Sequence, residues 1–295
     1  MKLSEAVRGV SGTLAADGEF SCIAFATEQE QSQFLTFLEK EKFLPALDNS
    51  KISCVLTTSA LAEKIPPHIK GVFLCDRPKA ALFEIHNRLA RHPDYVGASA
   101  ATVVGEGCSI SPLAAIDREN VVIGDRVTIE PFVVIKGRVI IGNDVTIRSG
   151  AVIGCKGFSF SKDTQGQNVS VEDTARIIIE DHVEIFEQVA ISTGIFPWEE
   201  TRIGENTKVI DAKGKSQVSV TVPGLCGNAV PLDPKVEVWV GVGAIVSNRV
   251  RVGDGARVSL GSVVTKEVPA GQTVSGNFAI DHQKFLSNLK KSLEE

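Results

Sequence analysis

Histidine is the side chain best suited to accept a proton near neutral pH, and the chain contains five histidines, at positions 68, 86, 92, 182 and 282. No two of them have the H-x-x-x-H or similar spacing of metal ligands, so the sequence predicts no metal site. His86 and His92 fall on or near a predicted helix, where we expect surface or core-edge roles. We therefore do not expect either of these two histidines to take part in catalysis.

A pair of aromatic residues is the second chemical feature. Phe158 and Phe160 stand two apart, so in an extended backbone their rings point to the same side. They belong to a segment, residues 155–174, that interrupts the surrounding pattern and contains a long polar run. Because long loops inside compact domains are often functional, we expect this pair to face a ligand. A solvated excursion without a ligand is the alternative.

A six-residue repeat must position these side chains. An aliphatic residue recurs at every sixth position from Ile123 to Ile153, and a small or branched residue follows four places after each. A period of six fits neither a helix nor an alternating strand and is typical of a parallel β-helix. We expect Gly124, Gly142 and Gly154 where the backbone turns tightly or takes a positive φ. The same register continues at Val104, Ile110, Ile116, Ile179, Ile185, Ile191, Ile203, Val209, Val240, Val246, Val252, Val258 and Val264.

The repeat divides the chain into three parts. Residues 1–96 carry no hexads and are expected to form a small α/β domain. Residues 97–278 form the predicted β-helix, which loses its phase at 210–238. Residues 279–295 are expected to form a terminal helix whose apolar stripe packs on an oligomer.

Within the first part, apolar runs predict strands at residues 21–26, 52–57 and 71–75. The segment between the first two, which contains Phe34, Leu38 and Phe43, is expected to hold one or two helices. Asp76 is expected to cap a further helix with Pro78 in its first turn, and Leu82, Ile85 and Leu89 share one face of that helix.

Composition narrows the class of protein. The net charge of −5 and the isoelectric point near 5.7 give no reason to expect a nucleic-acid partner. No apolar run is long enough to cross a bilayer, and the start of the chain lacks the apolar core of a signal peptide. The six cysteines are scattered without a C-x-x-C pair, which favours reduced thiols over disulfides or zinc. We therefore expect a cytoplasmic protein without a membrane segment.

Four segments of the chain resemble motifs of one known family. Residues 149–160 are similar to a G-A-V-I-G-x-x-G-F-x-F signature, and residues 179–185 to an I-x-D-x-V-E-I motif. Residues 73–83 resemble a strand, turn and helix of an N-terminal domain, and residues 276–282 resemble the exit from a β-helix into a terminal helix. Together these segments resemble the UDP-3-O-acylglucosamine N-acyltransferases, and the resemblance covers nearly the whole chain. It implies a left-handed β-helix that forms a homotrimer and acylates the amine of a nucleotide-linked aminosugar for lipid A or surface polysaccharide.

The resemblance also implies how the substrates bind. Phe43 would stack on the base of the sugar nucleotide, with an ordinary core aromatic as the alternative. Phe158 and Phe160 would hold an acyl or sugar group in a groove between subunits. The acyl group would come from acyl carrier protein or coenzyme A as co-substrate, and no bound cofactor is expected.

The expected catalytic histidine is missing. Counting from Thr201 to the position of the family's H-N pair reaches Gln217 or Val218, and a second family histidine matches Arg249, which we retain as a substrate-binding candidate. Ser192-Thr193-Gly194 replaces the family's D-R-G. The candidates left to act as base are His182, outward on a hexad, and His282, just beyond the β-helix.

Three functions therefore stay open on the sequence. The first is N-acyl transfer to a nucleotide aminosugar, slower than in relatives that keep the histidine. The second is a trimer without catalytic activity, or with impaired activity, that uses its grooves for binding or as a scaffold. The third is acetylation of a dTDP-aminosugar.

Overall fold

The chain forms two compact units. The computed structural model describes residues 1–157, 159–162, 166–209, 219–220, 239–240, 245–246, 252–253, 256–259, 262–264 and 267–276. Unit 1 comprises Met1–Ala100, Lys156–Arg176 and Thr193–Glu199, and unit 2 comprises Ala101–Cys155, Ile177–Ser192 and Glu200–Glu295. Two segments from within the hexad region thus belong to unit 1. In the described part of the chain, no helix is both long and apolar enough to cross a membrane.

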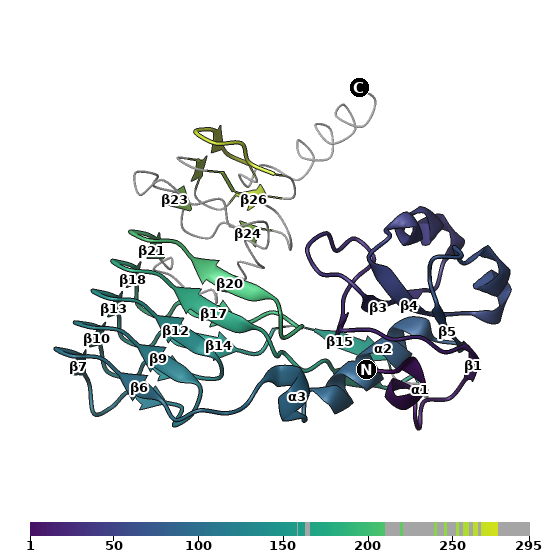
Figure 1. Ribbon diagram of the computed structural model, residues 1–295. Coiled ribbons are helices and arrows are strands. Elements are labelled where there is room, and N and C mark those ends of the chain that lie inside the picture. The colour runs from purple at the N-terminus through teal and green to yellow at the C-terminus, as the bar shows by residue number, and fades with distance from the viewer. Residues whose placement is uncertain are drawn as a thin grey trace. The chain divides into compact units, whose positions relative to one another are not determined.

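Unit 1 is built on a five-stranded sheet (Figure 1). Its strand order is β1 (Thr13–Ala16), β5 (Gly71–Leu74), β4 (Ile52–Thr57), β3 (Phe34–Leu38) and β2 (Cys22–Ile23), with only β1 antiparallel to its neighbour. The described helices of this unit are α1 (Leu3–Ala6), η1 (Glu41–Asp48), η2 (Ser59–Lys64), α2 (Pro78–Leu89) and α3 (Pro93–Val96). The α/β character expected for this part of the chain is present.

Two local predictions for unit 1 are corrected. The segment between the first two predicted strands holds one helix, η1, as expected, but Phe34–Leu38 within it is a strand of the sheet. Both faces of that strand are covered, and a strand buried on both sides reads as a continuous apolar run. Helix α2 has Arg77 rather than Asp76 as its N-cap, with Pro78 at the first helical position as expected. The shared face of Leu82, Ile85 and Leu89 is confirmed, since all three are buried.

The two later segments complete the core of unit 1. Val171 and Phe196 are buried in the same cluster as Leu82 and Phe83 of α2. The Phe196 ring lies 5.3 Å from the Phe25 ring, centroid to centroid, in an edge-on arrangement. Residues 1–100 therefore lack part of the apolar surface on which their own helix packs.

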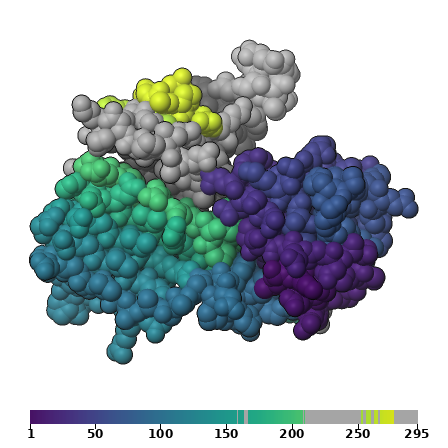
Figure 2. Space-filling view, in the orientation of Figure 1, coloured from purple at the N-terminus to yellow at the C-terminus, as the bar shows by residue number. Residues whose placement is uncertain are grey.

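Unit 2 contains three five-stranded parallel sheets whose strands stack coil upon coil (Figure 1). Ile129 pairs with Ile147, 18 residues later, so three hexads make one coil. The inward aliphatic side chains form one continuous buried cluster. This is the predicted left-handed parallel β-helix, coloured teal to green in the space-filling view (Figure 2).

Each of the three faces contains five strands among the described residues. The first face holds β7 (Ser109–Ile110), β10 (Thr128–Ile129), β13 (Thr146–Ile147), β18 (Glu184–Ile185) and β21 (Lys208–Val209). The second holds β8 (Ala115–Ile116), β11 (Val134–Ile135), β14 (Val152–Cys155), β19 (Ala190–Ser192) and β22 (Ser219–Val220). The third holds β6 (Val103–Val104), β9 (Val121–Ile123), β12 (Val139–Ile141), β17 (Arg176–Ile179) and β20 (Glu200–Ile203).

The last hexads also keep their register. Val240 pairs with Val258, and Val246 with Val264, along β23 (Trp239–Val240), β25 (Arg257–Val258), β27 (Thr273–Val274), β24 (Ile245–Val246) and β26 (Val263–Val264). Within the predicted break at 210–238, Ser219–Val220 still pairs with β19. The predicted terminal helix at 279–295 lies outside the described residues.

Two different requirements explain the glycines of the hexads, namely a positive φ at one position and close contact between coils at another. Gly154 has a φ of 83°, as expected. Gly124 does not take a positive φ; a side chain there would meet the carbonyl oxygen of Gly142 at 2.6 Å in the next coil. Close stacking of coils therefore requires that glycine, whereas several corners with positive φ carry other residues, at Asn120, Arg126, Phe132, Asp144, His182, Gln188 and Asn206.

We expect Phe196→Ala to lower the free energy of unfolding of unit 1 by about 3–5 kcal/mol, because it leaves a cavity under α2. Denaturant unfolding followed by Trp198 fluorescence measures the change, since the Phe196 and Trp198 rings stack 6.0 Å apart. Phe43→Ala is the matched control, because Phe43 is 55% exposed. Equal stabilities of the two variants would contradict the role of Phe196 in the core.

Two buried threonines on neighbouring strands offer a second test. The Thr57 hydroxyl donates to the Leu38 carbonyl oxygen at 3.0 Å, whereas the Thr36 hydroxyl has no hydrogen-bond partner in the described structure. Thr36→Val should stabilise the protein by about 1 kcal/mol, and Thr57→Val should destabilise it by a similar amount. Thermal unfolding of both variants checks the opposite signs, and a shared sign would refute the assignment.

Candidate functional site

The aromatic segment predicted from the sequence begins a β-hairpin in unit 1. Strands β15 (Phe160–Lys162) and β16 (Asn168–Ser170) pair antiparallel, and Phe160 is opposite Ser170. The Phe160 side chain is 51% exposed, so it is not part of the core. Phe158 lies outside the described residues. The ligand-binding role of the pair stays a prediction, with one ring placed at the surface.

Helix α2 fixes the return strand of this hairpin. The Asn87 side-chain nitrogen donates to the Ser170 carbonyl oxygen at 2.9 Å, and its oxygen accepts from the Glu172 backbone N–H at 2.8 Å. His86 Nε2 lies 2.8 Å from the Glu172 carbonyl oxygen. Adjacent residues of one helix therefore hold three backbone groups of the return strand.

His86 is a core residue rather than a surface or core-edge residue. Its Nε2 donates to the Glu172 carbonyl, which leaves Nδ1 to accept from the Tyr95 hydroxyl at 3.0 Å. Burial lowers the pKa of His86, so the ring is held neutral. Because both nitrogens are occupied, His86 has a structural role and no free position for proton transfer.

Asp173, which sequence reasoning missed, lies at the base of the hairpin. Its Oδ2 accepts from the Gly157 backbone N–H at 2.7 Å, while its buried Oδ1 has no hydrogen-bond partner among the described groups. Burial raises the pKa of the carboxyl to about 6. No motif indicates this residue, since its environment comes from two segments that meet only in the fold.

The segment that replaces the family's D-R-G carries two buried hydroxyls. The hydroxyls of Ser192 and Thr193 are buried and lack hydrogen-bond partners in the described structure. The Ser192 backbone carbonyl, by contrast, accepts from the Thr201 hydroxyl at 3.2 Å. From the sequence, these residues are notable only because they replace the family's D-R-G; the burial of their hydroxyls is seen only in the structure.

His182, the described candidate for a base, lies at an outer corner of the β-helix. Its side chain is 52% exposed, and Nδ1 is 4.0 Å from Asp144 Oδ2. Arg126 already binds both oxygens of Asp144 at 2.7 Å. Among the described residues, His182 therefore lies at the solvent-exposed surface, beside the charged side chains of Asp144 and Arg126. His282, Arg249 and Gln217 lie outside the described residues.

Phe43 is an exposed residue on η1, so the core alternative is wrong. The Lys42 ammonium lies 4.8 Å from the centroid of its ring. An exposed aromatic ring beside a cation could accept a base on its face and an anion at its edge. Its role in nucleotide binding stays a prediction.

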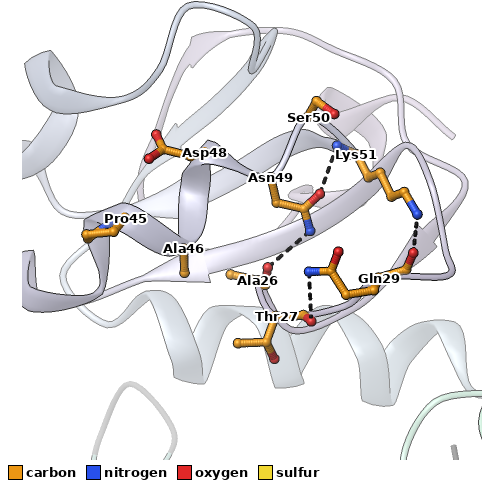
Figure 3. Close-up of a pocket in the computed structure, with 9 residues that line it drawn as sticks. All are labelled: Ala26, Thr27, Gln29, Pro45, Ala46, Asp48, Asn49, Ser50 and Lys51. Carbon is orange, nitrogen blue, oxygen red and sulfur yellow. Dashed lines mark hydrogen bonds between the residues drawn. The ribbon is translucent and has the colours of Figure 1, made fainter. Parts of the chain in front are cut away.

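A pocket of about 460 Å³ lies beside the end of η1 (Figure 3). Asn49 crosses it and donates to the carbonyl oxygens of Ala26 and Glu28, and Lys51 donates to the Gln29 carbonyl oxygen. Phe43 is not among the residues that line it. Because these polar groups already bind the loop backbone, we interpret the pocket as a loop junction and not as the expected nucleotide site.

The structure provides no metal centre in its described residues, since no group of three or more His, Cys, Asp or Glu side chains is placed to hold an ion. The arrangement contains an exposed aromatic on η1 and a fixed hairpin with an exposed aromatic, both in unit 1, and the stacked coils of unit 2.

The chain is similar to known hexapeptide-repeat acyltransferases. Residues 120–155 match the family model described as bacterial transferase hexapeptide (six repeats). The UDP-3-O-acylglucosamine N-acyltransferase of Coxiella burnetii is 28% identical over 234 residues, which cover 71% of this chain and 67% of that protein. The enzyme of the same name from Rhizobium meliloti is 33% identical over 156 residues, or 51% of this chain and 43% of that one.

A solved structure of Arabidopsis UDP-N-acetylglucosamine acyltransferase aligns with 63% of this chain and 73% of its own, at 18% identity and a TM-score of 0.39. The sequence relationship to the curated enzymes is substantial, and the hexad match coincides with the stacked coils of unit 2. The chain is a hexapeptide-repeat protein of the acyltransferase class and a homologue of the UDP-3-O-acylglucosamine N-acyltransferases.

Proposed function

We propose that this protein transfers an acyl group to the amine of a nucleotide-linked aminosugar in lipid A or surface-polysaccharide synthesis. The observation that carries the proposal is the relationship to the curated N-acyltransferases over 234 residues. The hexad β-helix and the hairpin that begins with the family-like signature support it. The reduced thiols expected from the sequence support a cytoplasmic location.

The chemistry requires an amine, a thioester and a proton acceptor. The amine nitrogen attacks the thioester carbonyl carbon, the carbon–sulfur bond breaks, and the thiol of the acyl carrier protein or coenzyme A leaves. The proton lost by the amine goes to a base, which contributes typically ~10²–10⁴-fold to the rate. Since no histidine lies between His182 and His282, we propose a turnover correspondingly slower than in relatives that keep this base.

An assay with UDP- and dTDP-aminosugars, each offered with acyl coenzyme A and with acyl carrier protein, tests the function. We expect N-acylation of one nucleotide aminosugar, with the preferred nucleotide and donor set by relative kcat/KM. His182→Ala and His282→Ala serve as variants of the two remaining candidate bases. Turnover typical of the family that survives both substitutions would contradict the inference that the base is missing. No product with any pair of substrates would contradict acyl transfer.

The missing histidine favours a second candidate, a trimer that binds the nucleotide sugar without acylating it. Calorimetry distinguishes the two functions. Saturable binding of a nucleotide aminosugar with no product in the assay above supports the binding protein, whereas binding with product formation supports the enzyme.

We expect Phe43→Ala to raise the KM for the nucleotide sugar about 10-fold or more with kcat nearly unchanged, since stacking of a base on an aromatic ring contributes about 1–3 kcal/mol. Phe43→Tyr should retain the affinity, because it preserves the ring. In the binding-protein alternative, the Kd changes by the same factor. An unchanged KM or Kd in Phe43→Ala would remove Phe43 from the site.

We also propose that the protein is a homotrimer with parallel β-helix axes. An exposed apolar column on the third face supports this assembly. Val103 pairs with Val122, and Val122 with Ile140, in three successive coils, and all three side chains are exposed in the single chain. Contiguous exposed apolar side chains of this kind are typical of an interface.

Val122→Glu should dissociate the trimer, because it places a charge in the middle of the column. Sedimentation velocity at micromolar concentration measures the outcome. Val122→Thr, which keeps the branched shape, is the control and should remain trimeric. A stable monomer in the unmodified protein would refute the assembly.

A further inference from the structure

The base of the hairpin is held by a side chain where the backbone ladder ends. Among the described residues, the backbone bond nearest the base of its two arms runs from the Val171 N–H to the Ser159 carbonyl oxygen at 2.9 Å. Two residues further out, Asp173 Oδ2 accepts the Gly157 N–H at 2.7 Å. The carboxylate therefore joins the two arms at the point where the chain enters and leaves the hairpin.

Asp173 joins a return arm that is bound to helix α2 to an outgoing arm that begins at Lys156. The return arm, residues 170–172, is bound to α2 by His86 and Asn87. The outgoing arm begins at Lys156, whose exposed ammonium pairs with Glu172 at 3.1 Å. Asp173 directly follows the return arm in the chain. Its hydrogen bond to Gly157 therefore fixes the position of Gly157 relative to α2.

The charges around Asp173 make the link sensitive to pH. Burial is the largest cause that raises its pKa to about 6, and the carboxylates of Glu172 and Glu199 also raise it. The Gly157 N–H and the Lys156 ammonium lower it. His86 faces the same strand through the Glu172 carbonyl, and its own pKa is lowered. Near neutral pH the Asp173 carboxylate is therefore mostly ionised, with one oxygen unpaired.

We propose that Asp173 is a positioning residue that fixes Gly157, where the chain enters the hairpin that carries Phe160, for ligand binding by accepting the Gly157 N–H. A charge-assisted hydrogen bond is shorter and stronger than a neutral one, so the ionised carboxylate holds Gly157 more firmly than the protonated acid does. Gly157 is therefore held more firmly above the pKa of Asp173 than below it. This role in acyl transfer rests on the proposed function, whereas the link itself does not.

The stability linkage has the opposite direction. Because the folded pKa of about 6 lies above the ordinary value of 3.8, the contribution of Asp173 to stability is fully present below pH 3.8 and is lost as the pH rises through 6. At neutral pH the Asp173 carboxyl is therefore ionised, which lowers the stability of the fold relative to the protonated form. The hydrogen bond to Gly157 is strongest in this ionised form.

The test follows the Gly157 amide proton by NMR in full-length protein labelled with ¹⁵N-glycine. Gly157→Ala assigns the resonance by its disappearance and is a mild substitution, since the added methyl group would meet nothing closer than 3.6 Å. We expect the amide proton to move upfield as the pH falls, with a midpoint near 6. Asp173→Asn keeps an acceptor oxygen without the charge, so its Gly157 resonance should show no such titration.

Kinetics provide the functional readout. Above pH 7, Asp173→Ala should raise the KM for one substrate about five-fold, the equivalent of one lost hydrogen bond, with kcat within two-fold. We expect the KM of the unmodified protein to rise below pH 6. Asp173→Asn should recover part of the loss seen in Asp173→Ala and should not show that rise. An unchanged pH profile of KM in Asp173→Asn would overturn the role in ligand binding.

The two proposals fail separately. A Gly157 resonance that does not titrate near pH 6, or that titrates equally in Asp173→Asn, overturns the link whatever the activity. A resonance that titrates as expected in a protein without acyl transfer overturns the proposed function alone, and the Kd for the nucleotide sugar then replaces KM in the comparison.

Discussion

Register between coils is the constraint on which the structure depends. Each coil must return after its three strands so that its aliphatic side chains lie directly on those of the coil before. Acid and amide side chains reinforce this register at one corner. Asp125 accepts the Glu106 N–H, Asn143 accepts the Asp125 N–H, and Asp181 accepts the Asn143 N–H, each at 2.8 Å. A shift of one residue would break this ladder and bury polar side chains in the core.

The β-helix tolerates large excursions because they leave and return without changing the register. Ile153 pairs with Ile191, although 38 residues separate them instead of the 18 of an uninterrupted coil. The residues between them include the hairpin, which belongs to unit 1. A rigid repeat can therefore present an irregular segment, and side chains of another unit then determine the conformation of that segment.

The hexads could be predicted because each coil depends only on local periodicity and its neighbours. Phe34–Leu38 was wrongly expected to be helical, since a strand covered on both faces has no alternation to separate it from an apolar helix turn. The exposure of Phe43 could not be decided, because an aromatic has no preferred face without its neighbours. Asp173 could not be found, because its partner and its burial come from contacts between segments that periodicity does not describe.

Unit 1 takes part of its core from residues that are synthesised long after its first 100 residues. The first 100 residues leave the ribosome without Val171 and Phe196, which are buried against α2 in the finished protein. At roughly 5–20 residues per second, the next hundred residues take on the order of 5–20 s to appear. During that interval the nascent chain exposes an apolar face of α2, and the growing β-helix supplies the missing side chains from its own loops. The N-terminal part of unit 1 is thus translated first, and its core is completed later.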